Sequence, residues 1–172
     1  MNVNSNDNLY WTIINHKEWK IYIAATSKGL CFVGSQNGAK QELLLFKEKY
    51  FPQIEMVNDE VQLEVYKKEI IEFLDGERID FNLNVDFRGT AFQNDVWNAL
   101  RSINYGETKT YSDIAETINK PKSVRAVGTA IGANPLLIII PCHRVIGKNG
   151  ALSGYRGGLD MKKSLLKIES IH

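Results

Sequence analysis

The 172-residue sequence has few of the features that mark several specialised protein classes. It holds only two cysteines, Cys31 and Cys142, which are too few for a disulfide framework and are typical of a reducing compartment. Its longest apolar run, PLLIIIPC, is far shorter than the roughly 20 residues needed to cross a bilayer. The polar start, MNVNSNDN, lacks the basic and apolar segments of a secretory signal. We therefore expect a cytoplasmic protein that does not enter a membrane.

Metal-binding spacings are also missing. The chain has three histidines, one of them the terminal His172, and contains neither a CxxC nor an HxxxH pattern. A closed tetrahedral zinc site would have to collect its ligands from distant parts of the chain. We expect no metal site and no cofactor. Cys31 lies in an apolar, strand-like segment and is expected to face the core as a small hydrophobic residue.

The formal net charge is only +1, but the charged residues are unevenly distributed between the two halves of the chain. Residues 1–85 carry 9 Lys and Arg against 13 Asp and Glu, whereas residues 86–172 carry 12 against 7. A basic second half attracts polyanions such as nucleic acid, but a modest excess of this size also fits an ordinary solvated surface. Charge alone leaves both interpretations open.

The first half reads as a small α/β domain over residues 1–85. Apolar alternation at Trp19, Ile21 and Ile23 indicates a half-buried hairpin strand. Asp59 is a candidate N-cap for the second of two helices. The expected strands cover residues 9–14, 19–26, 29–35 and 79–87, and the expected helices cover residues 39–50 and 59–74.

The second half, residues 86–172, contains helical patterns separated by glycine and proline. The pattern predicts a helix over 90–103 with Thr90 as N-cap, a helix starting at Ser112, another over 122–134, and a last helix over 159–170. The middle two helices, joined by a turn with a proline, are typical of a helix-turn-helix, although such pairs also occur in plain helical cores. Gly128 and Gly132 lie four residues apart on one helix face, which leaves room for close approach of another backbone.

Cys142 and His143 form the most reactive pair in the sequence. A free thiol is mostly protonated at neutral pH and needs help to become a nucleophile. In an extended segment, adjacent side chains point to opposite sides, so His143 need not touch Cys142 directly, and a bridging water is one way to connect them. A carboxylate behind the imidazole would fix its tautomer, and Glu169 is the candidate. The alternative is that Cys142 is an inert, buried small residue.

Four separated segments together resemble one protein family. PCHRV at Pro141–Val145 resembles the active-site motif of the O6-alkylguanine-DNA alkyltransferases. GTAFQNDVWNALRSINYGETKTYSDIA, RAVGTAIGANP and GYRGGLDMKKSLLKIE resemble, in order, the family's approach to its helix-turn-helix, its recognition helix with an Asn hinge, and its pocket loop with the final helix. The resemblance is dense over residues 89–169, and the first 85 residues fit only the family's general plan.

The resemblance implies an α+β fold and a self-inactivating repair reaction. A small ribonuclease H-like α/β domain over residues 1–85 would precede a mainly helical, winged helix-turn-helix domain over residues 86–172. The substrate would be double-stranded DNA containing O6-alkylguanine, and the alkyl group, typically methyl, would move to Cys142 once per molecule. No cofactor is implied, and a monomer is expected. Acceptance of bulky alkyl groups or of O4-alkylthymine stays open.

The resemblance also implies which residues bind DNA. Arg125 would enter the base stack when the damaged nucleotide is turned out, and small residues would let the helix approach the minor groove. In Ala130 the sequence offers a further small residue for this purpose. The DNA-binding set implied by the resemblance is Arg125, Ala126, Gly128, Thr129 and Gly132.

A second set implied by the resemblance surrounds the thiol. His143 and Glu169 would activate Cys142, Tyr111 would donate to the base, and Asn134 would orient the pocket. Backbone carbonyls at Cys142 and Val145 would accept from the exocyclic amine of guanine, while Arg144 would be structural. The remaining pocket residues are Val145, Tyr155, Arg156 and Gly157. Arg156 departs from the small residue that some relatives carry, which puts the contact to the guanine oxygen in doubt.

Three other functions fit parts of the sequence. A non-catalytic alkyltransferase-like protein would bind lesions, but those relatives lack the cysteine that Cys142 supplies here. A transcriptional regulator with a helix-turn-helix would not need a thiol in the motif. A thiol hydrolase using Cys142 and His143 would turn over ester substrates.

Overall fold

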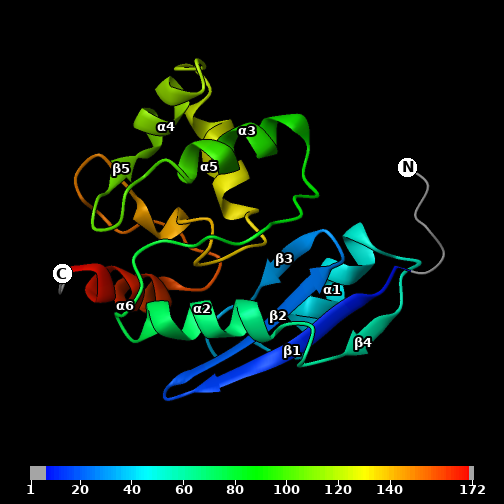
Figure 1. Ribbon diagram of the computed structural model, residues 1–172. Helices are drawn as coiled ribbons and strands as arrows, with labels where there is room; N and C mark the ends of the chain where they lie inside the picture. Colours follow the sequence, from blue (N-terminus) through cyan, green and yellow to red (C-terminus); the bar gives the residue numbers. More distant parts are fainter. Residues whose placement is uncertain (1–6, 171–172) are drawn as a thin grey trace.

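A computed structural model describes residues 7–170, so residues 1–6 and 171–172 lie outside the described part. Figure 1 shows a sheet with two helices in one half of the molecule and a compact group of helices in the other. The last helix returns to lie beside the second helix of the first half, near the junction. The arrangement confirms the predicted α+β class.

The sheet has the strand order β3-β2-β1-β4. Strands β1 (Leu9–His16) and β2 (Trp19–Thr26) form the predicted antiparallel hairpin, and β3 (Gly29–Val33) pairs antiparallel with β2. The sequence prediction missed β4 (Met56–Asn58), which pairs parallel with β1. Three residues are too few to show an alternating pattern, so only the tertiary pairing reveals this strand.

Two helices cover opposite faces of the sheet. Helix α1 (Lys40–Tyr50) closes a small aromatic cluster on one face, and α2 (Glu64–Leu74) packs on the other. The prediction that α2 begins at Asp59 is wrong. The Asp59 carboxylate accepts a hydrogen bond from the backbone N–H of Gln62 and caps a separate turn, and the helix begins only at Glu64.

The predicted strand over residues 79–87 is also wrong. This segment is an extended linker with one isolated bridge, Leu30 to Val85, within an otherwise unpaired run. Its backbone nevertheless follows the start of β3, because Leu30 donates to Asn84 and accepts from Asp86. Gly29, with φ of 150°, is required there, since a Cβ would lie 2.5 Å from the Asn84 carbonyl oxygen.

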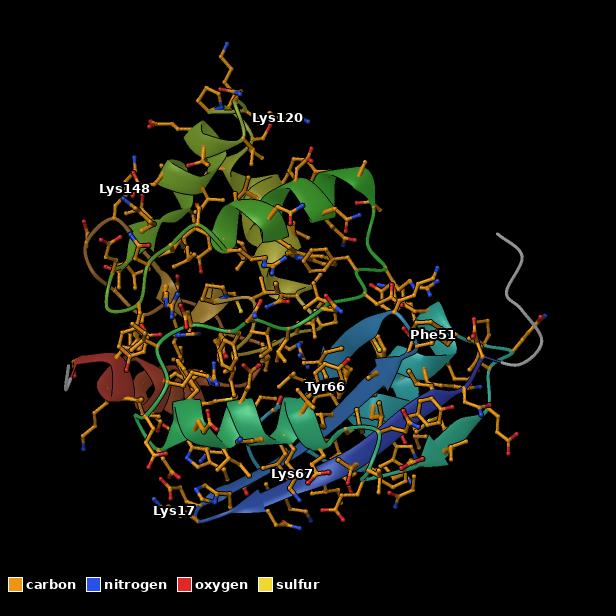
Figure 2. The ribbon with its side chains drawn as sticks, in the orientation of Figure 1. Lys17, Phe51, Tyr66, Lys67, Lys120 and Lys148 are labelled. Atoms are coloured by element: carbon orange, nitrogen blue, oxygen red, sulfur yellow. The ribbon has the colours of Figure 1, made fainter. Side chains whose placement is uncertain are left out.

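The helical half begins with α3 (Ala91–Leu100), and Thr90 caps it in a capping box as predicted. Helices α4 (Tyr111–Thr117) and α5 (Val124–Gly132) follow as the helix-turn-helix pair. The indole N–H of Trp97 donates to the Ala130 carbonyl at 2.9 Å and fixes α3 to α5. Lys120, in the turn between α4 and α5, projects at the end of the molecule farthest from the sheet (Figure 2).

The segment around the reactive cysteine is a single 3-10 turn, Cys142–Arg144, and not the extended strand expected from the sequence. It leads into β6 (Val145–Ile146), which pairs parallel with β5 (Lys109–Thr110). After a loop, α6 (Leu159–Ser170) ends the described chain close to the predicted bounds. The short β5–β6 pair places the end of the active-site turn beside the start of α4.

The larger hydrophobic core is shared by both halves of the molecule. It joins α2 and one face of the sheet to α3, α5, α6 and the apolar run before Pro141. Phe73 of α2 illustrates the continuity, because its ring lies 6.0 Å from that of Tyr105 and 6.4 Å from that of His143. The sheet domain is therefore part of the support of the reactive segment.

Candidate active site

Cys142 lies at the start of the 3-10 turn and is only 3% exposed. Its sulfur accepts a hydrogen bond from the side-chain amide of Asn134 at 3.2 Å. Burial raises the pKa of the Cys142 thiol, although the Asn134 amide and the positive charges of Arg156 and Lys162 act in the opposite direction. The thiol is therefore protonated at rest, and the surrounding donors and cations favour the thiolate once the proton leaves.

Asn134 connects the end of α5 to the reactive turn. It is fully buried, and its amide also donates to the carbonyls of Leu136 and Ile140 at 3.3 and 3.1 Å. Its side-chain oxygen accepts from the Leu136 N–H at 2.9 Å. The side chain is thereby held in one orientation, and the amide N–H group points at the sulfur of Cys142.

His143 and Glu169 form a buried pair on the other side of the turn. The Nε2 atom of His143 lies 2.8 Å from Oε1 of Glu169, and the exposed fractions of the two side chains are 0% and 2%. Arg144 donates to both oxygens of Glu169 at 2.8 and 3.1 Å and to the Ile103 carbonyl at 2.7 Å. Arg144 thus pairs with the carboxylate that holds the imidazole, consistent with the structural role expected for it.

The charges of this pair are set by burial and by each other. Burial lowers the pKa of His143 more than the neighbouring Glu169 raises it, so the imidazole is neutral at pH 7. Burial alone would raise the pKa of Glu169, but hydrogen bonds from His143 and Arg144 outweigh it and lower that pKa. The Nδ1 atom of His143 has no hydrogen-bond partner among residues 7–170. A neutral imidazole held through Nε2 has Nδ1 available to accept a proton.

Glu169→Ala is expected to lower the free energy of unfolding by about 3–5 kcal/mol, because it leaves the Arg144 charge buried without its partner. Urea denaturation measures the change. Lys163→Ala, an exposed change on the same helix, is the control and should alter stability by no more than about 0.5 kcal/mol. Equal losses in the two variants would contradict the importance of the buried pair.

Tyr111 and the loop before α6 form another side of the site. The Tyr111 hydroxyl accepts from Ser153 at 3.0 Å, which leaves its own proton free to donate. The Tyr155 hydroxyl is buried without a partner within the described chain, and burial, together with the nearby Cys142, raises its pKa well above the ordinary value. At Gly157 a Cβ would lie 2.4 Å from the Met161 sulfur and 2.8 Å from the Tyr155 ring, so a larger residue would force these side chains to shift.

Two of the expected pocket residues, Arg156 and Val145, already form hydrogen bonds with other parts of the protein. The guanidinium of Arg156 points toward the sheet domain and donates to the carbonyls of Asn134 and Val33, so it is not placed to contact a guanine oxygen. The Val145 carbonyl already accepts from Lys162 at 2.7 Å, but a carbonyl oxygen can accept a second bond.

Lys162 is the site residue that the sequence reasoning missed. It is fully buried, and its ammonium group donates to the carbonyls of Val145 and Ser153 at 2.7 and 2.8 Å. It thereby fixes the loop against the reactive turn, and its charge favours the Cys142 thiolate. One signal was available: Lys162 shares a helix face with Leu165 and Glu169, which is a core position and unusual for lysine.

The structure brings the expected DNA-binding residues onto one helix, with four of them exposed. Arg125, Ala126, Thr129 and Gly132 are solvent-exposed along α5, beside a hollow of about 710 Å³ between α5 and the start of α3. Gly128 is half-buried, and a Cβ there would make only ordinary contact with the Tyr111 ring. The expectation for Ala130 was wrong, because it faces the core.

Neither a metal centre nor a membrane segment emerges from the described residues. Within residues 7–170, His, Cys, Asp and Glu do not gather in groups that could hold a metal ion. In the same range, the helices are too short or too polar to span a membrane. Cys31 is buried in the smaller core, where its thiol donates to the Ala24 carbonyl.

Comparisons of the sequence with protein families and known proteins agree with this geometry. Residues 9–87 match the ribonuclease-like domain of 6-O-methylguanine DNA methyltransferases, and residues 91–171 match the DNA-binding domain of the same family. The inducible methylated-DNA–protein-cysteine methyltransferase of Bacillus subtilis is 57% identical over 161 residues, which cover 94% of this chain and 90% of that protein. The corresponding protein of Methanosarcina acetivorans is 41% identical, with 94% and 98% covered.

Solved structures show the same fold. The Mycobacterium tuberculosis protein OGT in complex with DNA superimposes with a TM-score of 0.79 at 32% identity, covering 94% of this chain and 93% of that one. The O6-methylguanine-DNA methyltransferase of Pyrococcus kodakaraensis gives a TM-score of 0.69 at 26% identity, with 94% and 98% covered. The extent of these matches confirms the resemblance seen in the motifs, and the chain belongs to the methylated-DNA–protein-cysteine methyltransferase family.

Proposed function

We propose that Cys142 is the residue through which this chain carries out its family's reaction, the transfer of a methyl group from O6-methylguanine in DNA to a cysteine of the protein. The sulfur attacks the methyl carbon, an S–C bond forms, and the bond from carbon to the guanine oxygen breaks. The thiol proton replaces the methyl group on guanine, so the products are S-methylcysteine and unmodified guanine. The observation that carries this proposal is a buried thiol that accepts from an oriented amide, next in the same turn to a histidine held by a carboxylate. Intact-mass analysis after incubation with a methylated duplex tests it.

We infer that His143 takes the thiol proton through a water molecule. Nε2 is held by Glu169, so Nδ1 is the atom able to accept. The resulting imidazolium would be stabilised by the Glu169 carboxylate. Because the thiol is protonated and the imidazole neutral at rest, the strong nucleophile is generated only when a substrate is in position.

We propose that a hydrogen bond donated by Tyr111 to the guanine base helps the guanine oxygen to leave. The leaving group accumulates negative charge as the C–O bond breaks, and a donor near it lowers the barrier. The Tyr111 proton is free for this because Ser153 supplies the bond that its oxygen accepts. Tyr155 would form the wall of the pocket, and the backbone carbonyls of Cys142 and Val145 would select guanine. Because Cys142 is only 3% exposed, we propose that the loop that carries Tyr155 shifts to admit the base.

We propose that α5 binds the DNA backbone and that Arg125 fills the space of the base that has been turned out. The exposed small residues on α5 let the helix approach the duplex closely, and the hollow beside them lies next to Arg125. Extruding a base costs a few kcal/mol, and a planar cation inserted in the stack offsets part of that cost.

Arg125→Ala is expected to slow repair of a methylated duplex by at least about tenfold, because base extrusion costs a few kcal/mol and loses its support. Reaction with free O6-benzylguanine should be unchanged, since the free base needs no extrusion. Single-turnover rates on the two substrates provide the measurement. Lys167→Ala, an exposed cation on α6, is the control. Equal slowing on both substrates would contradict the assignment of Arg125.

Several further features belong to the same proposal. A thioether is a poor leaving group, so methylated Cys142 persists and each molecule acts once. We place the domain boundary at residues 85/86, two residues before the first family match ends at residue 87, with the second beginning at residue 91. Two buried free thiols fit a reducing compartment such as the cytoplasm. We expect a monomer, because the reaction as proposed needs only one chain.

A further inference from the structure

The sheet domain contributes no atom to the Cys142, His143 and Glu169 set, yet it contacts the reactive segment directly. Strand β3 is an edge of the sheet, and an edge strand offers unpaired backbone groups. Val33 uses them to bind the segment after Asn134: its N–H donates to the Pro135 carbonyl at 2.9 Å and its carbonyl accepts from Leu137 at 3.4 Å. The segment after Asn134 is therefore attached to the edge of the sheet by a single parallel bridge, Val33 to Leu136, before the chain turns.

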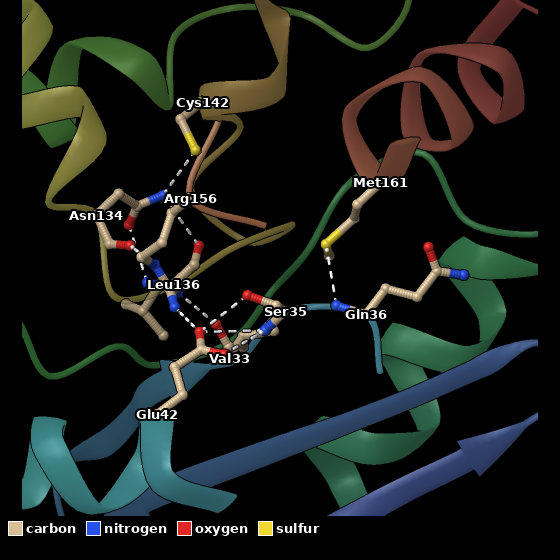
Figure 3. Close-up of polar contacts among 9 residues, drawn as sticks. All are labelled: Val33, Ser35, Gln36, Glu42, Asn134, Leu136, Cys142, Arg156 and Met161. Atoms are coloured by element: carbon tan, nitrogen blue, oxygen red, sulfur yellow. Dashed lines mark hydrogen bonds and ion pairs between the residues drawn. The ribbon is translucent and has the colours of Figure 1, made fainter. Parts of the chain in front are cut away.

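Arg156 crosses the same junction from the other side. Its guanidinium donates to the Asn134 carbonyl at 2.8 Å and the Val33 carbonyl at 2.7 Å, and it forms an ion pair with Glu42 of α1 (Figure 3). It also lies over the Phe32 ring, 5.5 Å from the centroid. One side chain in the pocket loop thus joins α1, β3 and the end of α5. The forked guanidinium suits this task because it donates in several fixed directions.

The Glu42 carboxylate that pairs with Arg156 also accepts hydrogen bonds from within the sheet domain. Its carboxylate accepts from the Ser35 N–H at 3.2 and 3.3 Å and from the Ser35 hydroxyl at 3.1 Å. A second contact joins the sheet domain to α6 nearby: the Gln36 N–H donates to the Met161 sulfur at 3.3 Å (Figure 3). The acceptor for Arg156 is therefore a fixed point of the sheet domain.

We propose that Arg156 and Glu42 form a latch by which the sheet domain positions Asn134 and the pocket loop for reaction at Cys142. The inference rests on the proposed role of Cys142 as methyl acceptor. Arg156 reaches the sulfur through one residue, since the Asn134 whose carbonyl it binds donates its amide to the sulfur at 3.2 Å. Arg156 is thus a positioning residue that does not touch the reacting atoms.

The latch has an electrostatic effect as well as a mechanical one. Burial raises the pKa of Cys142, and the Arg156 charge is among the groups that counter it. A permanent positive charge on Arg156 near Cys142 therefore favours the thiolate. Its hydrogen bond to the Asn134 carbonyl keeps the Asn134 amide in place to donate to the sulfur. The two effects can be separated by variants at position 156. Lysine keeps the positive charge but lacks the several N–H donors that the guanidinium presents in fixed directions.

The test measures the rate of Cys142 alkylation by free O6-benzylguanine as a function of pH, which removes DNA binding from the result. Arg156→Gln should lower the high-pH plateau by about tenfold to a hundredfold through misplacement of Asn134. It should also raise the apparent pKa of the thiol, because a positive charge that favours the thiolate is removed. Arg156→Lys should lower the plateau while leaving the apparent pKa near that of wild type. Lys148→Gln removes an exposed cation from the same loop and should change neither quantity.

Glu42→Gln tests the part of the latch that lies in the sheet domain. It should lower the plateau without raising the apparent pKa, because Arg156 stays in place but loses its anchor. The double variant Glu42→Gln/Arg156→Gln should be no slower than Arg156→Gln alone, since the two residues act as one unit. If the rate losses of the two single variants added in the double variant, Arg156 and Glu42 would act independently, which would contradict the proposal.

Two results would separate this inference from the proposed function. If wild type reacts at Cys142 and Arg156→Gln matches it in plateau and apparent pKa, the latch is wrong while the proposed function stands. A lower melting temperature for Arg156→Gln with an unchanged pH profile leads to the same conclusion, because the residue would then be structural only. If wild type does not react at Cys142 with either O6-benzylguanine or methylated duplex, the proposed function itself fails.

Discussion

Cys142→Ser is expected to abolish methyl transfer from a duplex containing O6-methylguanine. Wild type should gain the mass of one methyl group in place of one hydrogen, and no more than one, because S-methylcysteine is not turned over. Serine keeps nearly the same volume at this buried position, so the fold is preserved. Its hydroxyl is far less acidic than a thiol, and it does not give a competent nucleophile with a neutral histidine alone. Intact-mass spectrometry of the protein after incubation with excess duplex gives the result directly.

Cys31→Ala is the matched control, because Cys31 is the only other cysteine in the sequence. It is buried beside Phe32 and Phe46, and burial raises the pKa of its thiol. It should therefore play no part in transfer, and the variant should still gain one methyl group. Peptide mapping would place that group on Cys142. A mass gain in Cys142→Ser equal to that of wild type would show that another residue is the acceptor.

The elements with strong local signals were predictable from the sequence. The β1–β2 hairpin follows from apolar alternation that ends at a turn, and α3 follows from an apolar stripe behind the Thr90 capping box. The pairing of His143 with Glu169 was also expected, first because an imidazole base needs a carboxylate behind it and then because the family resemblance implied it. Spacing alone could not bring residues 26 positions apart together.

The errors arise where tertiary contacts override local pattern. Residues 79–87 alternate like a strand, but the segment lies along β3 with a single bridge because the edge of that strand is also used by the segment after Asn134. The start of α2 was misplaced because Asp59 caps a turn and not the helix. The turn at Cys142 was misread as extended because an apolar run followed by proline is typical of a strand.

The role of Arg156 was beyond the reach of sequence reasoning for a different reason. Its position in the pocket loop placed it in the expected pocket set without naming a partner, whereas its three acceptors lie on α1, β3 and just after α5. Long side chains reach across domain boundaries, so their partners depend on how the domains pack. The shared core around α2 and the reactive turn fixes that packing.

His143→Asn is expected to slow reaction of Cys142 with free O6-benzylguanine at pH 7 by about 10²–10⁴-fold, the usual contribution of a positioned general base. Asparagine is polar, and the buried Glu169 carboxylate keeps Arg144 as its partner. It cannot take a proton, and the raised pKa of Cys142 then leaves almost no thiolate at neutral pH. Stopped-flow or quenched single-turnover rates across a pH series supply the measurement.

The pH profile carries the sharper part of this prediction. Burial lowers the pKa of His143, so the neutral base persists as pH falls through the ordinary histidine range near about 6.5. The wild-type rate should therefore show a fall below that range that follows protonation of His143, and His143→Asn should lack this acid limb, its rate rising only at the higher pH where the Cys142 thiol itself ionises. His16→Asn, which loses a half-buried pair with Asp75 in the sheet domain, should keep the wild-type rate and limb. An acid limb that survives in His143→Asn would assign the proton transfer to another group, and the water-linked imidazole would no longer explain how a buried, protonated thiol becomes reactive.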